Sequence, residues 1–240
     1  MKSKETYIGI ENRVRFEILE SAIVDYIQNG SLDKVNCLNH IKQFTKGENR
    51  AIKILKHVSV LLTKNDKLMQ KFAKAIGRDN YYTLSSSERK AFILCLFAIS
   101  YPITYAMLTA FAQGFKVQDK LSKQAIIQKI GTIYGGNRAM DIAVTEIIPL
   151  FIECGIIKRE EVGIYSIDKK LIVRKPFLAE MIIFADIFLS NSKSIMISDI
   201  SHRPWFLYFD FEFSSLAYAN GLVSKKDSSI GKNYLTIKTR

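Results

Sequence analysis

The chain has 240 residues, of which 48% are apolar and 11% aromatic, and its 35 Lys and Arg against 23 Asp and Glu give a net charge of +12. This apolar content excludes an intrinsically disordered chain, which would be depleted in Ile, Leu, Val and Phe. A chain of this length forms one large domain or two small ones. Its four Pro and twelve Gly residues form no linker tract, so we expect any domains to pack directly against one another.

Residues 1–83 are predicted to form a basic helical domain. Four helical runs are expected in it, the last three over Asp33 to Phe44, Asn49 to Leu62 and Asp66 to Ile76, where apolar residues recur at helical spacing. The third run is expected to bury four apolar side chains: Ile52, Leu55, Val58 and Leu62. Lys and Arg residues project from the third and fourth runs, and they form either a solvated surface or a face that contacts phosphates.

Residues 84–175 are predicted to hold the core helices and a winged helix-turn-helix unit. Serines ahead of Glu88 mark the beginning of a long helix, and the apolar run 91–115 that follows contains no charge. That run is long enough to cross a bilayer, so membrane association is one alternative. Pro102 near its middle and several polar side chains disfavour a spanning helix. We therefore expect two buried helices that are broken at Tyr101-Pro102.

The segment 121–173 has the order helix, Gly-containing turn, helix, glycine and basic hairpin. Ser122 is expected to cap the first helix, and the second covers Arg138 to Cys154 after a turn at Tyr134-Gly135-Gly136-Asn137. Gly155 ends the second helix, and a short β-hairpin follows. This order resembles the winged helix-turn-helix superfamily. The fold class predicted is mainly α, with a helical N-terminal part, a winged-helix unit and a short β-hairpin.

The resemblance implies which residues would meet duplex DNA. The second helix would turn Arg138, Asp141 and Thr145 toward a major groove. Asn137 would cap that helix and present backbone amides to a phosphate. Basic side chains on and after the wing would contact the DNA backbone or minor groove: Lys158, Arg159, Lys169 and Lys170. Pro149 inside the helix and the negative charge of Asp141 depart from the pattern, so a winged unit used for packing or dimerisation is the alternative.

Residues 176–240 are predicted to form a helical segment with a C-terminal β-hairpin. Pro204 begins an apolar run that we expect to be helical as far as Ala219. The residues after Gly221 repeat the hairpin pattern, which makes them a possible second wing. Its basic side chains would bind phosphate: Lys225, Lys226 and Lys232.

Three features occur together in this chain: a basic helical N-terminal part, a Leu-Ser-x-x-Glu-Arg helix start at residues 84–89, and the winged-helix-like segment. Their order is similar to that of the small helical DNA-binding component of bacterial bacteriophage-exclusion systems. The similarity covers about residues 84–159 and concerns organisation. It implies a role in phage defence together with other protein subunits.

The sequence contains no recognisable catalytic arrangement. His40, His57 and His202 are scattered, without a second ligand at helical spacing, so no metal site is expected. The Asp/Glu-x-Lys triplets at Glu88 and Asp168 lack the partner acid with which a nuclease holds Mg²⁺. We therefore predict a protein that is not an enzyme and that uses no cofactor and no small-molecule substrate.

The net positive charge makes double-stranded DNA the expected partner, contacted mostly through its phosphates by an accessory or regulatory protein. The alternative from another class is a helical protein–protein interaction module whose charge only confers solubility. Three Cys residues among apolar neighbours, and an N-terminal sequence unlike a signal peptide, predict a cytoplasmic protein.

Overall fold

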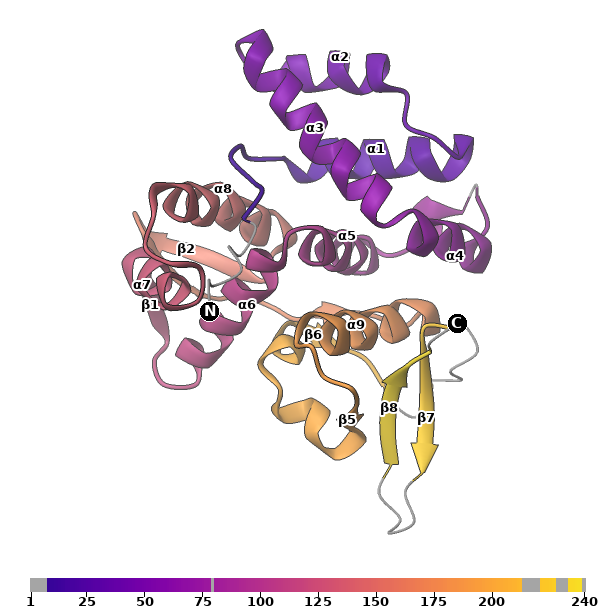
Figure 1. The fold of residues 1–240 in the computed structure, drawn as a ribbon, viewed down its shortest axis with the longest axis vertical. Helices are drawn as coiled ribbons and strands as arrows, with labels where there is room; N and C mark the ends of the chain where they lie inside the picture. The colour runs from indigo at the N-terminus through magenta and orange to yellow at the C-terminus, as the bar shows by residue number, and fades with distance from the viewer. Residues whose placement is uncertain (1–7, 79, 213–220, 228–232, 239–240) are drawn as a thin grey trace, which may run out of the picture.

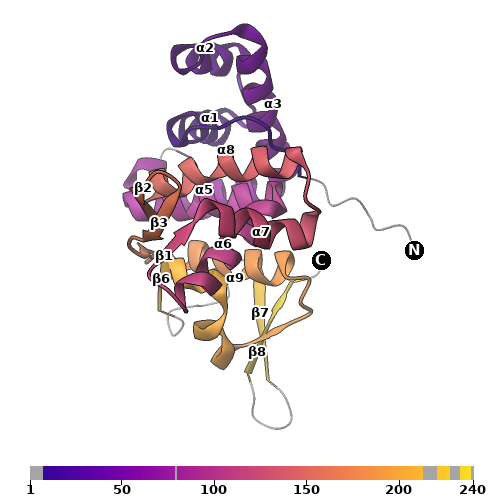
Figure 2. The same ribbon diagram turned by 90° about the vertical axis from the view of Figure 1, so that its left-hand side faces the viewer.

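The computed structural model describes residues 8–78, 80–212, 221–227 and 233–238, and it is mainly helical (Figure 1). The N-terminal part consists of four helices: α1 (Phe16–Asn29), α2 (Lys34–Phe44), α3 (Glu48–Lys64) and α4 (Asp66–Ile76). Helix α1 packs against α5 (Ser86–Ser100) and α8 (Arg138–Cys154), and Figure 2 shows it above both. A single cluster of buried apolar side chains runs through the helical layers.

The charge-free run 91–115 forms two helices. Helix α5 ends at Ser100, α6 (Pro102–Phe115) begins at Pro102, and the two are bent by 116°. Proline is suited to the first position of a helix because its missing N–H would have no partner there. Within the described residues, no single helix has the length and apolarity to cross a membrane, although the bent pair meets both criteria jointly. Most side chains of this pair are buried inside the protein.

The beginning of α5 is held by Glu88, which is buried. Ser85 Oγ accepts a hydrogen bond from the Glu88 amide at 3.2 Å, and the Glu88 carboxylate accepts one from the Ser85 amide at 2.9 Å. Its other oxygen accepts the amides of Arg174 and Lys175 at 3.1 and 3.0 Å. Burial alone would raise the pKa of Glu88, but these donors outweigh it and hold the pKa below its usual value of 4.5.

We expect Glu88→Gln to lower the free energy of unfolding by about 1–3 kcal/mol at pH 7, because buried donors then lose a charged acceptor. A carboxylate with a lowered pKa stabilises the fold above its unfolded-state pKa, and the effect is lost as the pH falls through the folded-state value. The difference between wild type and variant in urea unfolding should therefore shrink below about pH 4. Glu17→Gln is the control, because Glu17 is also an acid in the first turn of a helix, α1, but is exposed. Equal differences at pH 7 and pH 3 would contradict the assignment.

Residues 102–167 combine helices with a small sheet. After α6 come β1 (Lys120–Ser122), α7 (Lys123–Tyr134), α8, β2 (Ile157–Glu161) and β3 (Ile164–Ile167). The three strands form an antiparallel sheet in the order β1-β3-β2. The two helices and the hairpin lie where the sequence predicts them, with α8 matching the predicted bounds. Strand β1 was not predicted, because three residues are too few for a visible alternation.

The described residues between 171 and 238 include one α-helix, α9 (Pro176–Leu189), which packs against α5. Strand β4 (Leu171–Ile172) pairs in parallel with β6 (Phe209–Asp210). A second antiparallel sheet has the order β5-β8-β7, from β5 (Ile195–Met196), β7 (Val223–Asp227) and β8 (Asn233–Ile237). The two strands of the predicted C-terminal hairpin, β7 and β8, are thus present and paired, and the turn between them lies outside the described residues.

The helix predicted from Pro204 to Ala219 is wrong over its described part. Pro204–Tyr208 is a short 3-10 helix that follows another at Ile197–His202, and β6 comes next. The reason is tertiary: Trp205 donates its Nε1 hydrogen to the Ile182 carbonyl at 3.0 Å, and pairing with β4 supplies backbone partners that a helix would otherwise supply. Residues 213–220, which include the end of the predicted helix, lie outside the described residues.

The buried stripe of α3 matches the predicted one at Val58 and Leu62, which are both buried, and differs from it elsewhere. Ile52 is 50% exposed and Leu55 is only partly buried, whereas Ala51 and Ile54 are in the core. Apolar side chains lie on more than one side of α3, so the sequence offers neighbouring stripes that could each be the buried one. Its packing against α1, α2 and α5 decides which one is covered.

Candidate nucleic-acid interface

Helix α8 presents the predicted side chains along one exposed face. Asn137 caps it as expected, because its side-chain oxygen accepts the Met140 amide at 2.9 Å. Arg138, Asp141 and Thr145 are all exposed. The Thr145 hydroxyl donates to the Asp141 carbonyl at 2.9 Å, which leaves its oxygen as an acceptor. The helix continues through Pro149 to Cys154, so the proline does not restart the chain.

The flank of α8 beside this face is covered by the segment that leads into α1. Two acids of α8 take part: the Arg13 amide donates to Glu146 at 2.6 Å, and the Arg13 guanidinium forms an ion pair with Glu153. Glu153 also accepts the Phe16 amide at 2.8 Å. Both carboxylates are therefore engaged by the N-terminal segment. The open part of α8 is its amino-terminal half, which carries Arg138.

The first hairpin, β2-β3, carries Lys158 and Arg159 on the protein surface. Lys158 Nζ lies 3.0 Å from Glu160, and the Arg159 guanidinium lies over the Tyr165 ring, 6.0 Å from its centroid. Hydrogen bonds from Ser166 and Lys158 lower the pKa of Glu160. An exposed ion pair such as Lys158–Glu160 contributes little free energy. Lys158 can therefore exchange this partner for a phosphate at small cost.

The predicted residues Lys169 and Lys170 are exposed but lie at the base of the hairpin, after β3 ends. The Lys169 amide donates to the carbonyl of Gly155, which ends α8. The two ends of α8 are about 25 Å apart at 1.5 Å of rise per residue. The structure thus separates these lysines from Arg138 and does not bring all the predicted basic residues into one cluster.

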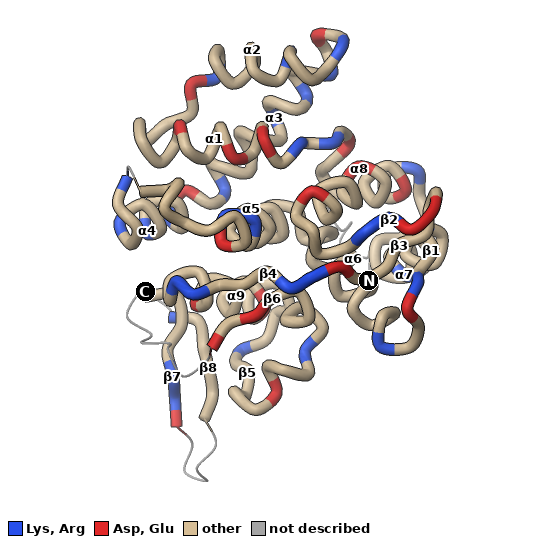
Figure 3. Tube along the Cα trace, turned by 180° about the vertical axis from the view of Figure 1, so that it is seen from behind, with Lys and Arg blue, Asp and Glu red and all other residues tan. Residues whose placement is uncertain are grey.

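On the second hairpin, Lys225 and Lys226 are exposed on β7. Lys225 Nζ lies 3.8 Å from Asp227, another exposed pair. In Figure 3, basic positions mark both β2 and β7. Lys232 lies outside the described residues.

Some of the lysines on α3 and α4 have structural partners. Lys53 pairs with Glu11 at 3.0 Å, and Lys71 donates to the Gly221 carbonyl at 2.8 Å. The exposed side chains of Arg50 and Lys56 complete the basic surface of α3. This surface is the second region of the described protein that could meet phosphates.

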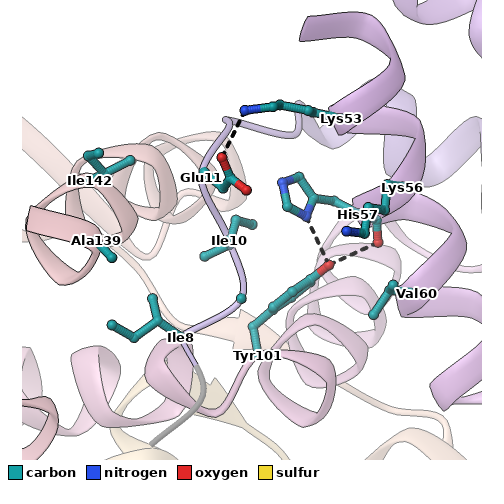
Figure 4. Close-up of a pocket in the computed structure, with 11 residues that line it drawn as sticks. Ile8, Ile10, Glu11, Lys53, Lys56, His57, Val60, Tyr101, Ala139 and Ile142 are labelled. Atoms are coloured by element: carbon teal, nitrogen blue, oxygen red, sulfur yellow. Dashed lines mark hydrogen bonds and ion pairs between the residues drawn. The ribbon is translucent and has the colours of Figure 1, made fainter. Parts of the chain in front are cut away.

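A cavity of about 420 Å³ lies between the N-terminal segment, α3 and the amino-terminal end of α8 (Figure 4). Tyr101 donates its hydroxyl hydrogen to the His57 carbonyl at 3.1 Å and lies 3.3 Å from His57 Nδ1. Burial lowers the pKa of His57, which keeps the ring neutral. Glu11, the carboxylate in the lining, has its pKa lowered by its hydrogen bond to Lys53. The cavity lining therefore combines an exposed ion pair, Glu11–Lys53, with a His57 ring that lies beside the Tyr101 hydroxyl.

Comparison of the chain with protein-family models, with curated proteins and with solved structures found no match. Among the described residues, no group of three or more His, Cys, Asp and Glu side chains is placed to share a metal ion. Burial raises the pKa of Cys37 to about 11 and that of Cys154 to about 12, so these thiols stay protonated. Exposed basic side chains lie on α8, on both hairpins and on α3.

Proposed function

We propose that this chain is a non-catalytic protein that binds duplex DNA through residues 102–167, which form a winged helix-turn-helix unit. In that role it acts as an accessory or regulatory factor, within a larger system of the kind that its organisation resembles, the bacteriophage-exclusion systems. The order of helices and hairpin in the sequence also resembles a winged helix-turn-helix.

The observation that carries the proposal is strand β1. It lies directly before α7, and it pairs with β3 through Leu121 and Tyr165 to complete a three-stranded sheet in the order β1-β3-β2. Helix, strand, two helices and a hairpin, closed into a sheet in this order, resemble the arrangement of a winged helix and so support the proposal. Because β1 gives no sequence signal, its presence supports the proposal independently of the pattern that suggested it.

The proposed contact uses backbone phosphates more than base edges. Helix α8 offers Arg138 and its positive amino-terminal end, and the wing adds Lys158 and Arg159. On the open face of α8, Asp141 and Thr145 are able to read bases, and Arg138 is able to contact either a base or a phosphate. The exposed basic side chains of α8 and the two hairpins outnumber these base readers, so we propose weak sequence preference.

A salt titration tests this function. Binding of the full chain to a fluorescent duplex, measured by anisotropy, is expected to weaken linearly in log K against log salt, with a slope of about −3 to −5 for three to five neutralised phosphates. Competition with random duplexes should reduce binding almost as well as competition with a selected sequence. A preference of about 10³-fold or more for one sequence would instead indicate a specific repressor.

The absence of duplex binding at low salt would contradict the proposal and favour the helical interaction module. A flat salt dependence would do the same, because a contact without phosphate neutralisation releases no counterions.

A further inference from the structure

The C-terminal part of the chain shares a leading helix and a three-stranded sheet with residues 102–167, while its described residues have two 3-10 helices and β6 between the first strand and the hairpin, where the first unit has α7 and α8. Helices α6 and α9 both have 14 residues, and both begin with a proline, Pro102 and Pro176. In each case the first strand of a three-stranded sheet follows at the same distance, since Leu121 and Ile195 each lie nineteen residues after the proline. The strand orders correspond: β1-β3-β2 in the first sheet and β5-β8-β7 in the second.

The strand registers of the two sheets agree around the central residue of each sheet, although the pairing of β2 with β3 shifts between Arg159 and Glu161, whereas that of β7 with β8 is continuous. In the first sheet, Tyr165 of the central strand pairs with Leu121 on one side and with Arg159 on the other. In the second sheet, Leu235 of the central strand pairs with Ile195 on one side and with Lys225 on the other. A shift of one residue would turn every side chain to the other face of a sheet, so shared register places equivalent side chains on equivalent faces.

The bases of the two hairpins also agree. Each hairpin follows a glycine with a left-handed backbone, Gly155 and Gly221, both at φ 73°. The residue after β3 donates its amide to the carbonyl after Gly155, from Asp168 to Ile156 at 3.1 Å. In the second hairpin, the residue after β8 donates its amide to the carbonyl of the residue after Gly221, from Lys238 to Leu222 at 3.0 Å.

We propose that the described residues between 176 and 238 form a second winged unit and that its wing strand β7, with Lys225 and Lys226, binds the same DNA duplex at a second position. Lys225 occupies the register position of Arg159, so the equivalent position of both wings is basic and exposed. The proposal rests on the proposed function of the first unit and uses only described residues of the second.

Both wings belong to one packed body. Helix α5 packs against α6 and α8 of the first unit and against α9 of the second, so the two wings are held on one body without a linker. Once one wing is bound, the other meets the same duplex as an intramolecular event at high effective concentration. The affinity gain then depends on whether the duplex is long enough to reach both wings.

The test compares duplexes of about 12 and about 36 base pairs, roughly one and three helical turns. Anisotropy titrations of the wild-type chain should show tighter binding to the long duplex than to the short one. The difference should be at least about tenfold after correction for the larger number of binding positions on the long duplex. Lys225→Glu/Lys226→Glu should lose at least about tenfold on the long duplex and less than about threefold on the short one. Lys225→Gln/Lys226→Gln, which removes charge without reversing it, should show the same pattern more weakly.

The matched control is Lys34→Glu/Lys46→Glu, two exposed lysines at and just after the ends of α2, which lies at the opposite end of the molecule from the second hairpin (Figure 1). It changes the net charge equally and should affect both duplexes alike. An equal loss on both duplexes for the hairpin variants, or no loss beyond the control, would overturn the second contact. Failure of the wild-type chain to bind either duplex would instead refute the proposed function itself.

Discussion

Reversing the charges of Arg138, Lys158 and Arg159 together is expected to weaken duplex binding by at least about 100-fold at physiological salt, because three phosphate contacts are replaced by repulsion. The salt slope should fall by about three, one for each lost contact. All three side chains are exposed. Exposed substitutions usually change the free energy of unfolding by less than about 0.5 kcal/mol. Losing the contact of Arg159 with the Tyr165 ring adds about 0.5–1 kcal/mol.

Two further variants make this result interpretable. Arg138→Glu/Lys158→Glu spares the Arg159 contact and should still remove most of the affinity. Charge reversal of Lys34, Lys46 and Lys67, which are exposed on or beside α2 and α4, serves as the control with the same change in net charge. Retained affinity in the first triple variant would move the binding surface to the basic residues of α3, where Arg50 and Lys56 are exposed.

Arg203→Ala is expected to destabilise the protein by about 3–5 kcal/mol, the largest stability effect that we predict for a single substitution. Arg203 Nε donates to the buried Asp186 carboxylate, whose other oxygen accepts the Tyr105 hydroxyl at 2.8 Å. Arg203 also donates to Ser190 Oγ at 3.0 Å. Without the guanidinium, Asp186 is left as a buried charge with the Tyr105 hydroxyl as its partner in this cluster. Urea unfolding at pH 7 measures the loss.

An exposed ion pair near this cluster supplies the contrast. Arg174 lies 3.7 Å from Asp210, and both side chains are more than half exposed. Arg174→Ala should therefore cost less than about 1 kcal/mol. The double variant Asp186→Asn/Arg203→Met removes both charges and should recover part of the loss of Arg203→Ala. If Arg203→Ala and Arg174→Ala cost the same, the buried pair does not have the role assigned to it.

The helix boundaries were predictable because their signals are local. Ser85 with Glu88, Asn137 and Gly155 act within one turn of the helix end that they define, and each is found in that role. Pro102 separates α5 from α6 for an equally local reason, the missing N–H and fixed φ of proline. The exposure of Arg138 and Lys158 also follows from short-range pattern, since a charged side chain avoids the buried face of its own element.

The errors have a common physical cause, which is competition from distant parts of the chain. The apolar run from Pro204 has strong helical character, but β4, more than thirty residues earlier, takes Phe209–Asp210 into a sheet. Strands β1 and β5 have three and two residues, too few for an alternation, and they exist because they pair with β3 and β8. Their positions depend on partners that no local window contains.

By itself, the sequence determined the mainly helical class, most of the helix boundaries, both hairpins and the basic side chains that they carry, because capping, proline geometry and charge act over a few residues. Only the tertiary structure decided which flank of α8 is open, since the segment that covers it includes Arg13, 133 residues from its partner Glu146. It also decided that the central residues of the two sheets, Tyr165 and Leu235, have corresponding partners on both sides. That correspondence depends on pairing between strands that are distant in the sequence, so it is not predictable from the residues of either strand alone.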